Sequence, residues 1–488
     1  MSQANYELNG VLARYFGTPD EPPIEHWPAE RIADYQRDAV ADQLTHVWEH
    51  SPFYQRKFEE AHVTPDDFRT LDDLRRFPFT VKDELRGDPW VLLSVPKNDV
   101  CLAHTSTGTT GGDWSYTLYS RDDMYLHDQV PSPRLLMPVR SSDVVIDALP
   151  YEMSSAGQSF QRSLQGTASA LVVPVGKGGF YSDPVKTVKI MADLKADVLI
   201  TTPPYAMLLA EIAGQMNISL NDNVRLRFMW LTGEGCSQAY RRRLEELWNC
   251  PGIVFYGSME CGSIGIECSE QSGGHVSQGH VHIEIIDPET GEPLPAGEVG
   301  EVVCTVLQRK ASPLIRFRTQ DLAFVDSEPC ACGVKFPRVH IRGRIVDQIA
   351  GSSDRVARPD QREGRGESRA TTGHALRSSG RATPPISPLM IEEVLFAQSE
   401  MGGNYQIYSD GNSLLVEAEL RTGAGDGRPA KQRIEDMLAE RGLQAELRWV
   451  EHIPRTGGKT RRIRPLTDRD DVMRQPSILR PNPAETNS

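Results

Sequence analysis

The sequence between residues 140 and 260 constrains the fold most, because short apolar runs there alternate with segments long enough for helices. Strands and helices at this spacing predict a layered α/β fold whose neighbouring strands run parallel. Ligands in such folds bind beyond the carboxyl ends of the strands, where the loops lie. The predicted strands are 144–149, 170–175, 198–201, 227–231 and 253–256, and the predicted helices are 183–194, 206–215 and 239–248.

The rest of the chain divides into a helical start, a β-rich middle and a separate end. Residues 28–60 show helical spacing that stops at Ser51 and Pro52, and from position 281 the pattern changes to strands. Residues 351–384 are dense in arginine, serine and glycine and poor in large apolar side chains, which predicts a flexible insert. A solvated linker is favoured there over an anion-binding basic tract. The segments predicted after it, 390–397, 414–420, 430–441 and 445–450, make a small α/β lobe.

The charge balance and the lack of long apolar segments exclude several classes of protein. The 488 residues carry a net charge of −14, whereas a nucleic-acid-binding domain is expected to be basic. No stretch reaches the ~18 apolar residues of a membrane span, and the first residues lack the basic start and apolar run of a signal peptide. Eight cysteines in a chain of this length do not indicate a disulfide framework. We therefore expect a cytoplasmic protein without nucleic-acid or membrane partners.

Residues 105–111 combine hydroxyl side chains with glycines, as loops that hold phosphate groups do. Glycines let the backbone approach a ligand, and successive N–H groups with added hydroxyl donors form a concave site for anionic oxygens. No lysine follows the glycines, so the stretch is not the P-loop of NTPases. Taken alone, such a stretch is more often a plain surface loop. Its members are Thr105, Ser106, Thr107, Gly108, Thr109, Thr110 and Gly111.

Two loops that follow predicted strands place a glycine and a carboxylate together. The first contains Gly233 and Glu234. Both loops lie at strand ends, where ligand-binding loops are expected. If the second loop has no functional role, Tyr256 is expected to be an aromatic residue of the core, and Glu260 a helix cap or a surface charge. The second loop consists of Tyr256, Gly257, Ser258, Met259 and Glu260.

Five segments resemble, in order, the motifs of the adenylate-forming, AMP-binding superfamily, and most closely those of its phenylacetate–CoA ligase branch. The resemblance extends over nearly the whole chain, from the segments 51–54 and 77–80 to Lys459. Each segment alone is of moderate specificity, and five in the right order are strong evidence. The segments are the phosphate loop 105–111, the strand-end motif 256–260, the motif 315–322, the hinge motif 343–347 and the lysine loop 454–459.

The resemblance implies an ATP- and Mg²⁺-dependent ligase that joins a carboxylic acid to AMP, releases pyrophosphate and then transfers the acyl group to a nucleophile. The carboxylate and the phosphate are both anions, so catalysis rests on positioning and charge neutralisation. By resemblance, Lys459 bridges the acid carboxylate and the α-phosphate. Glu260 holds Mg²⁺, a hard cation suited to carboxylate oxygens, and Thr109 and its neighbours hold the triphosphate.

The resemblance also assigns nucleotide-binding residues and domains. Tyr256 would stack on adenine, and Gly233 and Glu234 would line the same pocket. Asp321 would accept hydrogen bonds from both ribose hydroxyls, and Arg344 would contact the ribose or a phosphate. A small mobile lobe would rotate on its hinge between the two half-reactions. The implied units are an N-terminal domain 1–343 of layered mixed sheets and helices, a hinge 344–350, the insert 351–384 and an α/β lobe 385–488.

The acid is expected to lie between the strand-end loops. In the resembled family a glycine-rich run is common at this place, and here the run that starts at Tyr151 replaces it. We therefore predict a pocket more polar than one for phenylacetate. A hydroxy- or amino-substituted benzoate fits such a pocket. The candidate acid-binding residues are Tyr151, Ser155, Ala156, Gly157, Ser258 and Met259.

The acceptor of the acyl group stays open between CoA and an amine or hydroxyl. Family members that use CoA close a short loop over its pantetheine arm after the hinge, and here the insert 351–384 intervenes. CoA thioester formation is the default, and amide or ester formation is the alternative. We expect the protein to be a monomer or homodimer. A second alternative is a non-catalytic relative that binds a nucleotide or zinc. The retained set disfavours it, namely Thr109, Glu260, Asp321, Arg344 and Lys459.

A further set of residues supplies three thiolates and one imidazole, which suits a tetrahedral structural zinc. The single residue between two of the cysteines is tighter than the usual spacing. Three competing ligands exist (His280, His282 and Cys261), and four unrelated side chains are the other interpretation. Some members of the resembled branch carry a similar set, which favours zinc. The proposed ligands are Cys268, His275, Cys330 and Cys332.

Overall fold

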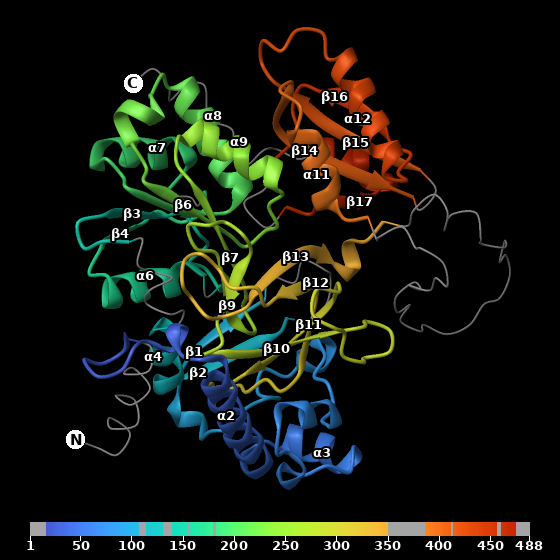
Figure 1. Cartoon of the computed structure of the whole chain (residues 1–488). Helices are drawn as coiled ribbons and strands as arrows, with labels where there is room; N and C mark the ends of the chain where they lie inside the picture. Colours follow the sequence, from blue (N-terminus) through green and yellow to red (C-terminus); the bar gives the residue numbers. More distant parts are fainter. Residues whose placement is uncertain are drawn as a thin grey trace, which may run out of the picture.

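The chain forms a large body and a small C-terminal lobe (Figure 1). A computed structural model describes residues 16–106, 114–129, 139–154, 156–178, 182–349, 386–410, 413–455 and 460–474. Within these ranges, no helix combines the length and the apolar character needed to cross a membrane. The predicted insert 351–384 and the loop residues 107–113 and 456–459 lie outside them.

One sheet of eleven strands runs through the body in the order β10-β11-β12-β13-β9-β8-β7-β6-β5-β3-β4. The five strands from β7 to β4 are parallel to one another, as the alternation of strands and helices predicts. Each begins within one residue of its predicted start. These strands are β7 (Gly252–Ser258), β6 (Phe228–Thr232), β5 (Val198–Thr201), β3 (Val144–Asp147) and β4 (Leu171–Pro174).

Helices cover both faces of the parallel strands, because both faces of these strands are apolar. On β5, Leu199 packs among the residues of three helices, and the next residue, Ile200, packs on the other face with Phe160 of a fourth helix. The helix predicted at 206 begins earlier, at Pro203, because proline is tolerated in a first helical turn. The helices are α7 (Pro184–Leu194), α8 (Pro203–Gln215) and α9 (Gln238–Trp248) on one face and α6 (Ala156–Thr167) on the other.

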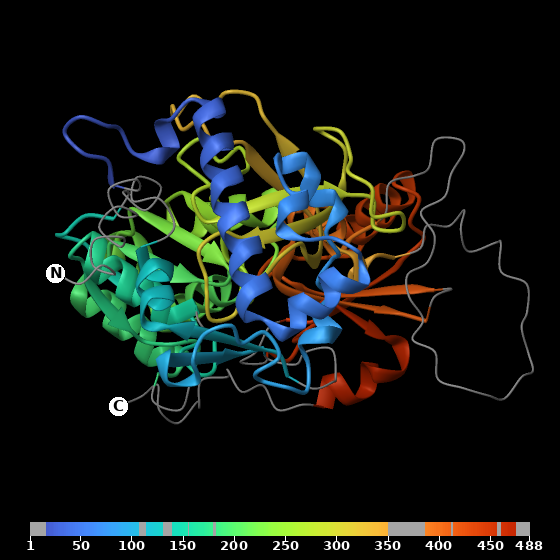
Figure 2. The same cartoon turned by 90° about the horizontal axis from the view of Figure 1, so that it is seen from below.

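The other half of the sheet is antiparallel and lies under the N-terminal helix α2 (Ala29–His50), which crosses it in Figure 2. Buried glutamines fix this contact: Gln36 Nε2 donates to Val281 O at 3.0 Å, and Gln43 Nε2 donates to Val306 O at 3.0 Å. The strands are β8 (Gly262–Ile266), β9 (Gly274–Val276), β10 (Val281–Ile286), β11 (Gly300–Val306), β12 (Phe317–Asp326) and β13 (Arg338–Arg344).

Shorter elements lie around this sheet. A two-stranded sheet leads into and out of the predicted phosphate loop. These elements are α3 (Pro52–Glu60), β1 (Val100–Thr105), β2 (Tyr116–Ser120) and α4 (Arg121–Gln129).

The lobe contains a four-stranded sheet in the order β16-β15-β14-β17. The sequence predicted two of these strands, 414–420 and 445–450, and missed β14 and the three-residue β17. In β14, Gly402, Gly403 and polar side chains interrupt the apolar alternation. The lobe elements are α11 (Pro388–Phe396), β14 (Met401–Ser409), β15 (Leu414–Leu420), α12 (Arg428–Glu440), β16 (Glu446–Val450), β17 (Ile463–Pro465) and α13 (Arg469–Arg474).

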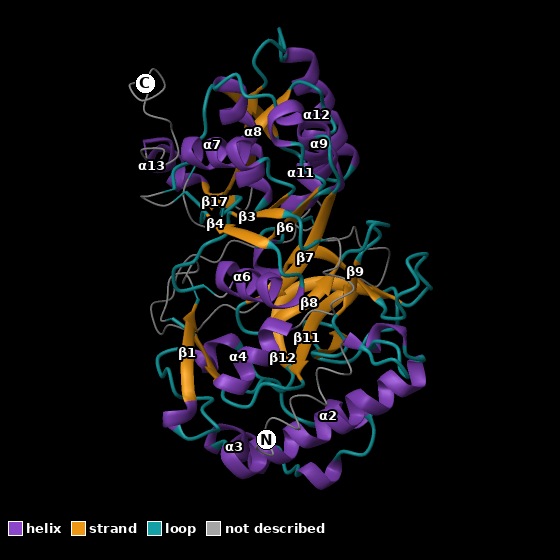
Figure 3. Ribbon diagram, turned by 90° about the vertical axis from the view of Figure 1, so that its left-hand side faces the viewer, coloured by secondary structure: helices purple, strands orange, loops and turns teal. Residues whose placement is uncertain are grey.

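The lobe packs on helices α8 and α9 of the body, at the end of the molecule opposite α2 and α3 (Figure 3). Tyr240 of α9 stacks on Phe396 of α11 with ring centroids 4.1 Å apart. The first amides of α9 donate to lobe carboxylates, Ser237 N to Glu392 Oε1 at 2.7 Å and Ala239 N to Glu393 Oε2 at 2.6 Å. Carboxylates at a helix N-terminus are favourable because they compensate its free N–H groups and its dipole.

Candidate active site

Three predicted nucleotide-binding residues from different strands meet in what we call the strand-end triad: Tyr256, Asp321 and Arg344. The Tyr256 hydroxyl donates to Asp321 Oδ2 at 2.9 Å, and Arg344 Nε donates to Asp321 Oδ1 at 3.1 Å. The register of β12 and β13 places Asp321 directly opposite Arg344. Burial, followed by the charge of Asp321, raises the pKa of Tyr256, so the phenol stays protonated and donates.

The triad leaves a well-oriented and partly exposed carboxylate, since 18% of the Asp321 side chain is accessible. Each oxygen of Asp321 takes one donor in the triad, and a carboxylate oxygen can accept more than one hydrogen bond. The Arg344 side chain is 41% exposed, so its guanidinium reaches solvent beyond the carboxylate. This arrangement can accept two adjacent hydroxyl groups and offer a cation beside them.

Gly233 and Glu234 follow β6 as predicted, and Glu234 is held by a lysine. Gly233 has a φ of 83°, a conformation that favours glycine. Lys177 Nζ lies 3.3 Å from Glu234 Oε1, and the two side chains are only 5% and 10% exposed. The sequence analysis missed Lys177, because a single lysine after a predicted strand carries no pattern.

Glu260 lies in the turn between β7 and β8 and pairs with Lys82 at 2.8 Å, with its own side chain 8% exposed. Lys82 belongs to the short 3₁₀ helix η4 (Lys82–Leu85) and was also missed, although it follows the segment 77–80 in sequence. At the start of this turn, Ser258 Oγ accepts the Cys261 N–H at 3.0 Å, with Gly257 and Ser258 at the end of β7 and Met259 in the turn itself. The carboxylate expected to hold Mg²⁺ therefore already faces a cation.

The ends of the predicted phosphate loop are tied together beside Glu260. Ser106 N donates to Ser115 O at 3.0 Å, and Ser115 N donates to Ser106 Oγ at 3.1 Å. Ser115 Oγ lies 3.5 Å from Glu260 Oε1, and Thr105 N donates to Met153 O at 2.9 Å. The base of the loop thus faces the turn that bears Glu260. The loop residues Thr107, Gly108, Thr109, Thr110 and Gly111, and also Ser155 and Lys459, lie outside the described residues.

Three of the candidate acid-binding residues, Tyr151, Ala156 and Gly157, follow the carboxyl end of β3, whereas Ser258 and Met259 lie at the end of β7. The Tyr151 hydroxyl donates to Asp147 Oδ2 at 2.9 Å, and Leu149 N donates to Asp147 Oδ1 at 3.2 Å. Asp147 is fully buried, and burial raises its pKa well above the ordinary value. Gly157, next to Ala156 at the start of α6, has room for Tyr151 because a Cβ there would lie 2.6 Å from the tyrosine ring.

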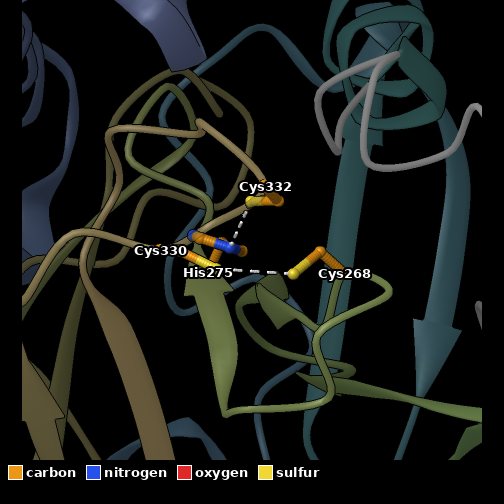
Figure 4. A group of neighbouring side chains, drawn as sticks. All are labelled: Cys268, His275, Cys330 and Cys332. Atoms are coloured by element: carbon orange, nitrogen blue, oxygen red, sulfur yellow. Dashed lines mark hydrogen bonds between the residues drawn. The ribbon is translucent and has the colours of Figure 1, made fainter.

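The four proposed zinc ligands converge in a group that we call the cysteine–histidine cluster: Cys268, His275, Cys330 and Cys332 (Figure 4). All their candidate ligand atoms lie within 4.8 Å of one another. The Cys268 and Cys330 Sγ atoms are 3.7 Å apart, and Cys332 Sγ is 3.3 Å from His275 Nε2. His275 Nδ1 donates to Phe336 O at 3.0 Å, which leaves the Nε2 lone pair directed at the thiols.

The competing ligands make other contacts. His280 Nε2 donates to the backbone oxygen of Cys261 at 2.8 Å, and His282 Nδ1 donates to Gln36 Oε1 at 3.0 Å. Burial lowers the pKa of both histidines. The tight spacing of Cys330 and Cys332 is possible because a turn, closed by Gly333 N donating to Cys330 O at 3.1 Å, presents both sulfurs on one side.

Comparison with known proteins agrees with the motifs. Residues 130–306 match the family model described as AMP-binding enzyme. The phenylacetate-coenzyme A ligase of Thermus thermophilus is 32% identical over 409 residues, which cover 82% of this chain and 83% of that protein. The phenylacetate-coenzyme A ligase of Pseudomonas putida is 28% identical, with 82% and 84% of the two chains covered.

A solved structure of similar fold gives a view of the lobe arrangement. The structure of 2-hydroxyisobutyryl-CoA ligase in the postadenylation state superposes with a TM-score of 0.78 at 22% identity, over 90% of each chain. The same enzyme in its thioesterification state gives a TM-score of 0.64 at 23% identity, over 93% and 95% of the chains. Of these two states, the first is nearer to the arrangement of body and lobe seen here.

The fold and the strand-end site define an enzyme of the adenylate-forming, AMP-binding class. Within this class the chain belongs to the phenylacetate–CoA ligase family, and it is an AMP-forming acid–CoA ligase. ATP, Mg²⁺ and CoA are therefore the co-substrates and cofactor that its site has to accommodate.

Proposed function

We propose that this ligase activates an aryl carboxylic acid, a hydroxy- or amino-substituted benzoate, and transfers the acyl group to CoA. The observation that carries the proposal is the polar pair of Tyr151 and Asp147 at the end of β3, between the strand-end loops where the acid is expected. A hydroxyl or amino substituent on the ring finds a hydrogen-bonding partner there, whereas unsubstituted phenylacetate does not. The curated relatives, named for phenylacetate, support an aryl acid in general.

In the first half-reaction an oxygen of the acid carboxylate attacks the α-phosphorus of ATP and pyrophosphate leaves. Asp321 accepts the ribose hydroxyls, Arg344 compensates the negative charge beside them, and Tyr256 presents its ring to the adenine. Mg²⁺, when bound, neutralises phosphate oxygens, and the Glu260 carboxylate fits it because carboxylates are preferred ligands of hard cations. Lys82 neutralises Glu260 in the absence of the metal, which keeps a buried carboxylate compensated.

In the proposed second half-reaction the acceptor is CoA and not an amine or hydroxyl. The thiolate of CoA attacks the acyl carbon, and AMP leaves with the electron pair of the broken bond. The residues on the two sides of the predicted insert 351–384, Ile349 and Ile386, pair in an antiparallel bridge, with Ile349 N donating to Ile386 O at 2.8 Å. The chain thus leaves and re-enters the hinge region at one point. The backbone next to the hinge is paired on both sides of the insert, which supports CoA as the acceptor.

We further propose that the cysteine–histidine cluster binds one structural Zn²⁺. Three thiolates and one imidazole at mutual distances within 4.8 Å fit a closed tetrahedral site, without the open position of a catalytic one. The hydrogen bond from His275 Nδ1 to Phe336 O fixes the tautomer that such a ligand requires. The zinc would tie the loop after β8 to the turn before β13.

The test is acid-dependent exchange of pyrophosphate into ATP over a panel of benzoates, phenylacetates and cinnamates. Mass spectrometry of the products with and without CoA identifies the acceptor. Fastest exchange with a hydroxy- or aminobenzoate and a CoA thioester product are expected. Exchange with long-chain fatty acids alone would overturn the aryl acid, and an amide or ester product would overturn CoA. No exchange with any acid despite ATP binding would favour the non-catalytic alternative. Elemental analysis should find one zinc per chain.

A further inference from the structure

Arg455 links the C-terminal lobe to the body. Its Nη2 lies 2.9 Å from Glu211 Oε1, on α8 of the body, and 3.3 Å from Glu419 Oε2, on β15 of the lobe. The exposed fractions of the side chains are 12% for Arg455, 10% for Glu419 and 31% for Glu211. Two carboxylates thus share one cation at the junction, in surroundings where such a contact is stronger than on an open surface.

The lobe has space for the side chain of Glu211 at Gly403. Gly403 of β14 has no side chain, and a Cβ at this position would lie 1.7 Å from Glu211 Oε1 and 2.9 Å from Arg455 Nη2. Any other residue at 403 would displace the carboxylate of the body from the lobe. The glycine is therefore a second observation, independent of the ion-pair distances, that the two surfaces are fitted to each other here.

Apolar packing joins the lobe to the body, and the ion pair lies beside it. Buried side chains of α8, of α9 and of the lobe belong to one apolar core. A small cavity of about 30 Å³ lies next to the ion pair, lined by Tyr205 and Leu208 of α8 and by Arg455 and Arg461 of the lobe, among others. The apolar packing is not directional, so the contact of Arg455 with Glu211 adds a charged link that depends on the orientation of the lobe.

The backbone around Arg455 is anchored to the lobe at both ends. Asn404 Nδ2 donates to Ile453 O at 3.3 Å, and Gln406 Nε2 donates to Arg461 O at 2.9 Å. Both amides belong to β14, the strand that contains Gly403. The segment that contains Arg455 therefore keeps a fixed orientation relative to β14. The contact of Arg455 with Glu211 thus also fixes the orientation of β14 on the body.

We infer that Arg455 is a positioning residue for the adenylation half-reaction: with Glu211 it holds the lobe in the orientation seen here. A rotation of the lobe about its hinge separates Arg455 from Glu211, whereas Glu419 moves with the arginine. The cation thus stays compensated in both orientations, and only one orientation gains the contact with the body. The inference rests on the acid–CoA ligase class and does not depend on which acid is activated.

The decisive variant is Glu211→Gln in the full-length enzyme, because it removes the charge on the body and leaves the Arg455–Glu419 pair of the lobe in place. Two reactions are measured with the acid that gives the wild type its fastest exchange. The first is ATP–pyrophosphate exchange, and the second is thioester formation from the supplied acyl-adenylate and CoA. We expect exchange to fall about tenfold, the size of one partly exposed charge-assisted hydrogen bond. Thioester formation should stay within about twofold.

Two further variants separate positioning from folding. Gly403→Ala pushes Glu211 away by steric contact and should reproduce the split between the half-reactions. Arg242→Gln is the matched control, because Arg242 also spans the junction, to Glu393 at 3.2 Å, but the pair is 58% and 39% exposed. This control should leave both half-reactions unchanged, as exposed ion pairs contribute little.

An equal loss of both half-reactions in Glu211→Gln would overturn the inference, since it would indicate a general structural defect. Unchanged exchange would overturn it as well. Absence of exchange in the wild type with every acid tested would instead contradict the proposed function, and it would be found before any variant is made. Arg455→Lys, which keeps the charge, should lose less exchange activity than Arg455→Met.

Discussion

The strand-end triad and the cysteine–histidine cluster lie on the same eleven-stranded sheet, but they balance their polar groups in opposite ways. In the triad, Asp321 already takes a proton donor from Tyr256 and a charged donor from Arg344. In the cluster, four potential ligand atoms face one another within 4.8 Å. Thiols are weak donors and acceptors, so these groups cannot compensate one another as the triad does.

This difference indicates which kind of ligand each site suits. In the proposed function, the ribose hydroxyls of a nucleotide add to a carboxylate that is already oriented, so the triad would bind and release substrate in every turnover. A cation at the cluster would compensate the negative charge of the cysteine thiolates, which the four ligands cannot do for one another. It is therefore expected to stay bound. The first arrangement suits a substrate and the second a structural ion.

The largest effect is expected from Cys332→Ser, which removes one ligand of the cluster. Bound zinc should fall from one per chain to less than about a tenth. The free energy of unfolding of the body should fall by about 4 kcal/mol, as for other losses of a structural metal. Elemental analysis and thermal unfolding measure both. Cys101→Ser, at an exposed free cysteine, is the control and should change neither. Full retention of zinc by the variant would break the comparison.

A smaller but still large effect is expected from Asp321→Ala at the triad. The variant loses the acceptor of the ribose hydroxyls and leaves Arg344 without its carboxylate, so KM for ATP should rise about 100-fold, or about 2.7 kcal/mol. Steady-state exchange at varied ATP measures this. Asp326→Ala, on the same strand β12, removes the partner of Arg338 and should lower stability without changing KM. An unchanged KM for ATP in Asp321→Ala would exclude the triad from nucleotide binding.

Tyr256→Phe sharpens the comparison by removing one donor of the triad while keeping the ring. Because the loss is a single hydrogen bond, KM for ATP should rise about fivefold, or about 1 kcal/mol. The same exchange assay measures it, with Tyr125→Phe, at an exposed tyrosine, as the control. A loss as large as that of Asp321→Ala would mean that the hydroxyl, and not the ring, is the main contact of Tyr256.

The smallest effect is expected at a third strand end, where the buried carboxyl group of Asp147 has the Tyr151 hydroxyl and the Leu149 amide as donors. Burial raises its pKa, so the folded state favours the proton, and wild-type stability falls as pH rises from the unfolded pKa of about 4 towards the folded one. Asp147→Asn does not titrate. It should raise the unfolding temperature by about 2 °C at pH 8 and by less at pH 4.

The control for this pH dependence is Asp193→Asn on the exposed surface of α7, which should be neutral at both pH values. A larger gain for Asp147→Asn at pH 4 than at pH 8 would contradict the sign. It would mean that the folded state favours the ionised carboxylate.

The parallel half of the fold could be predicted from local patterns because each strand is apolar on both faces and each helix has a regular apolar stripe. The prediction failed at β14, where Gly402 and Gly403 serve contacts with β15 and with Glu211 rather than an apolar face. Where contacts with residues distant in sequence require a glycine, the local sequence shows no apolar periodicity from which a strand could be predicted. The assigned domain boundaries, the phosphate loop and the lysine loop remain predictions.

By itself, the sequence determined the class of enzyme and the residue types of both sites, since the order of the motifs and the chemistry of each side chain follow directly from it. The tertiary structure decided which of these groups meet. It set Asp321 opposite Arg344 through strand register and brought Cys268 and His275 to Cys330 and Cys332. It also paired Lys82 with Glu260, Lys177 with Glu234, and Arg455 with Glu211. The physical reason is that an ion pair or a metal site depends on distances of a few ångströms. The packing of the whole sheet and lobe sets these distances, whereas a pattern along the chain specifies only what each residue could offer.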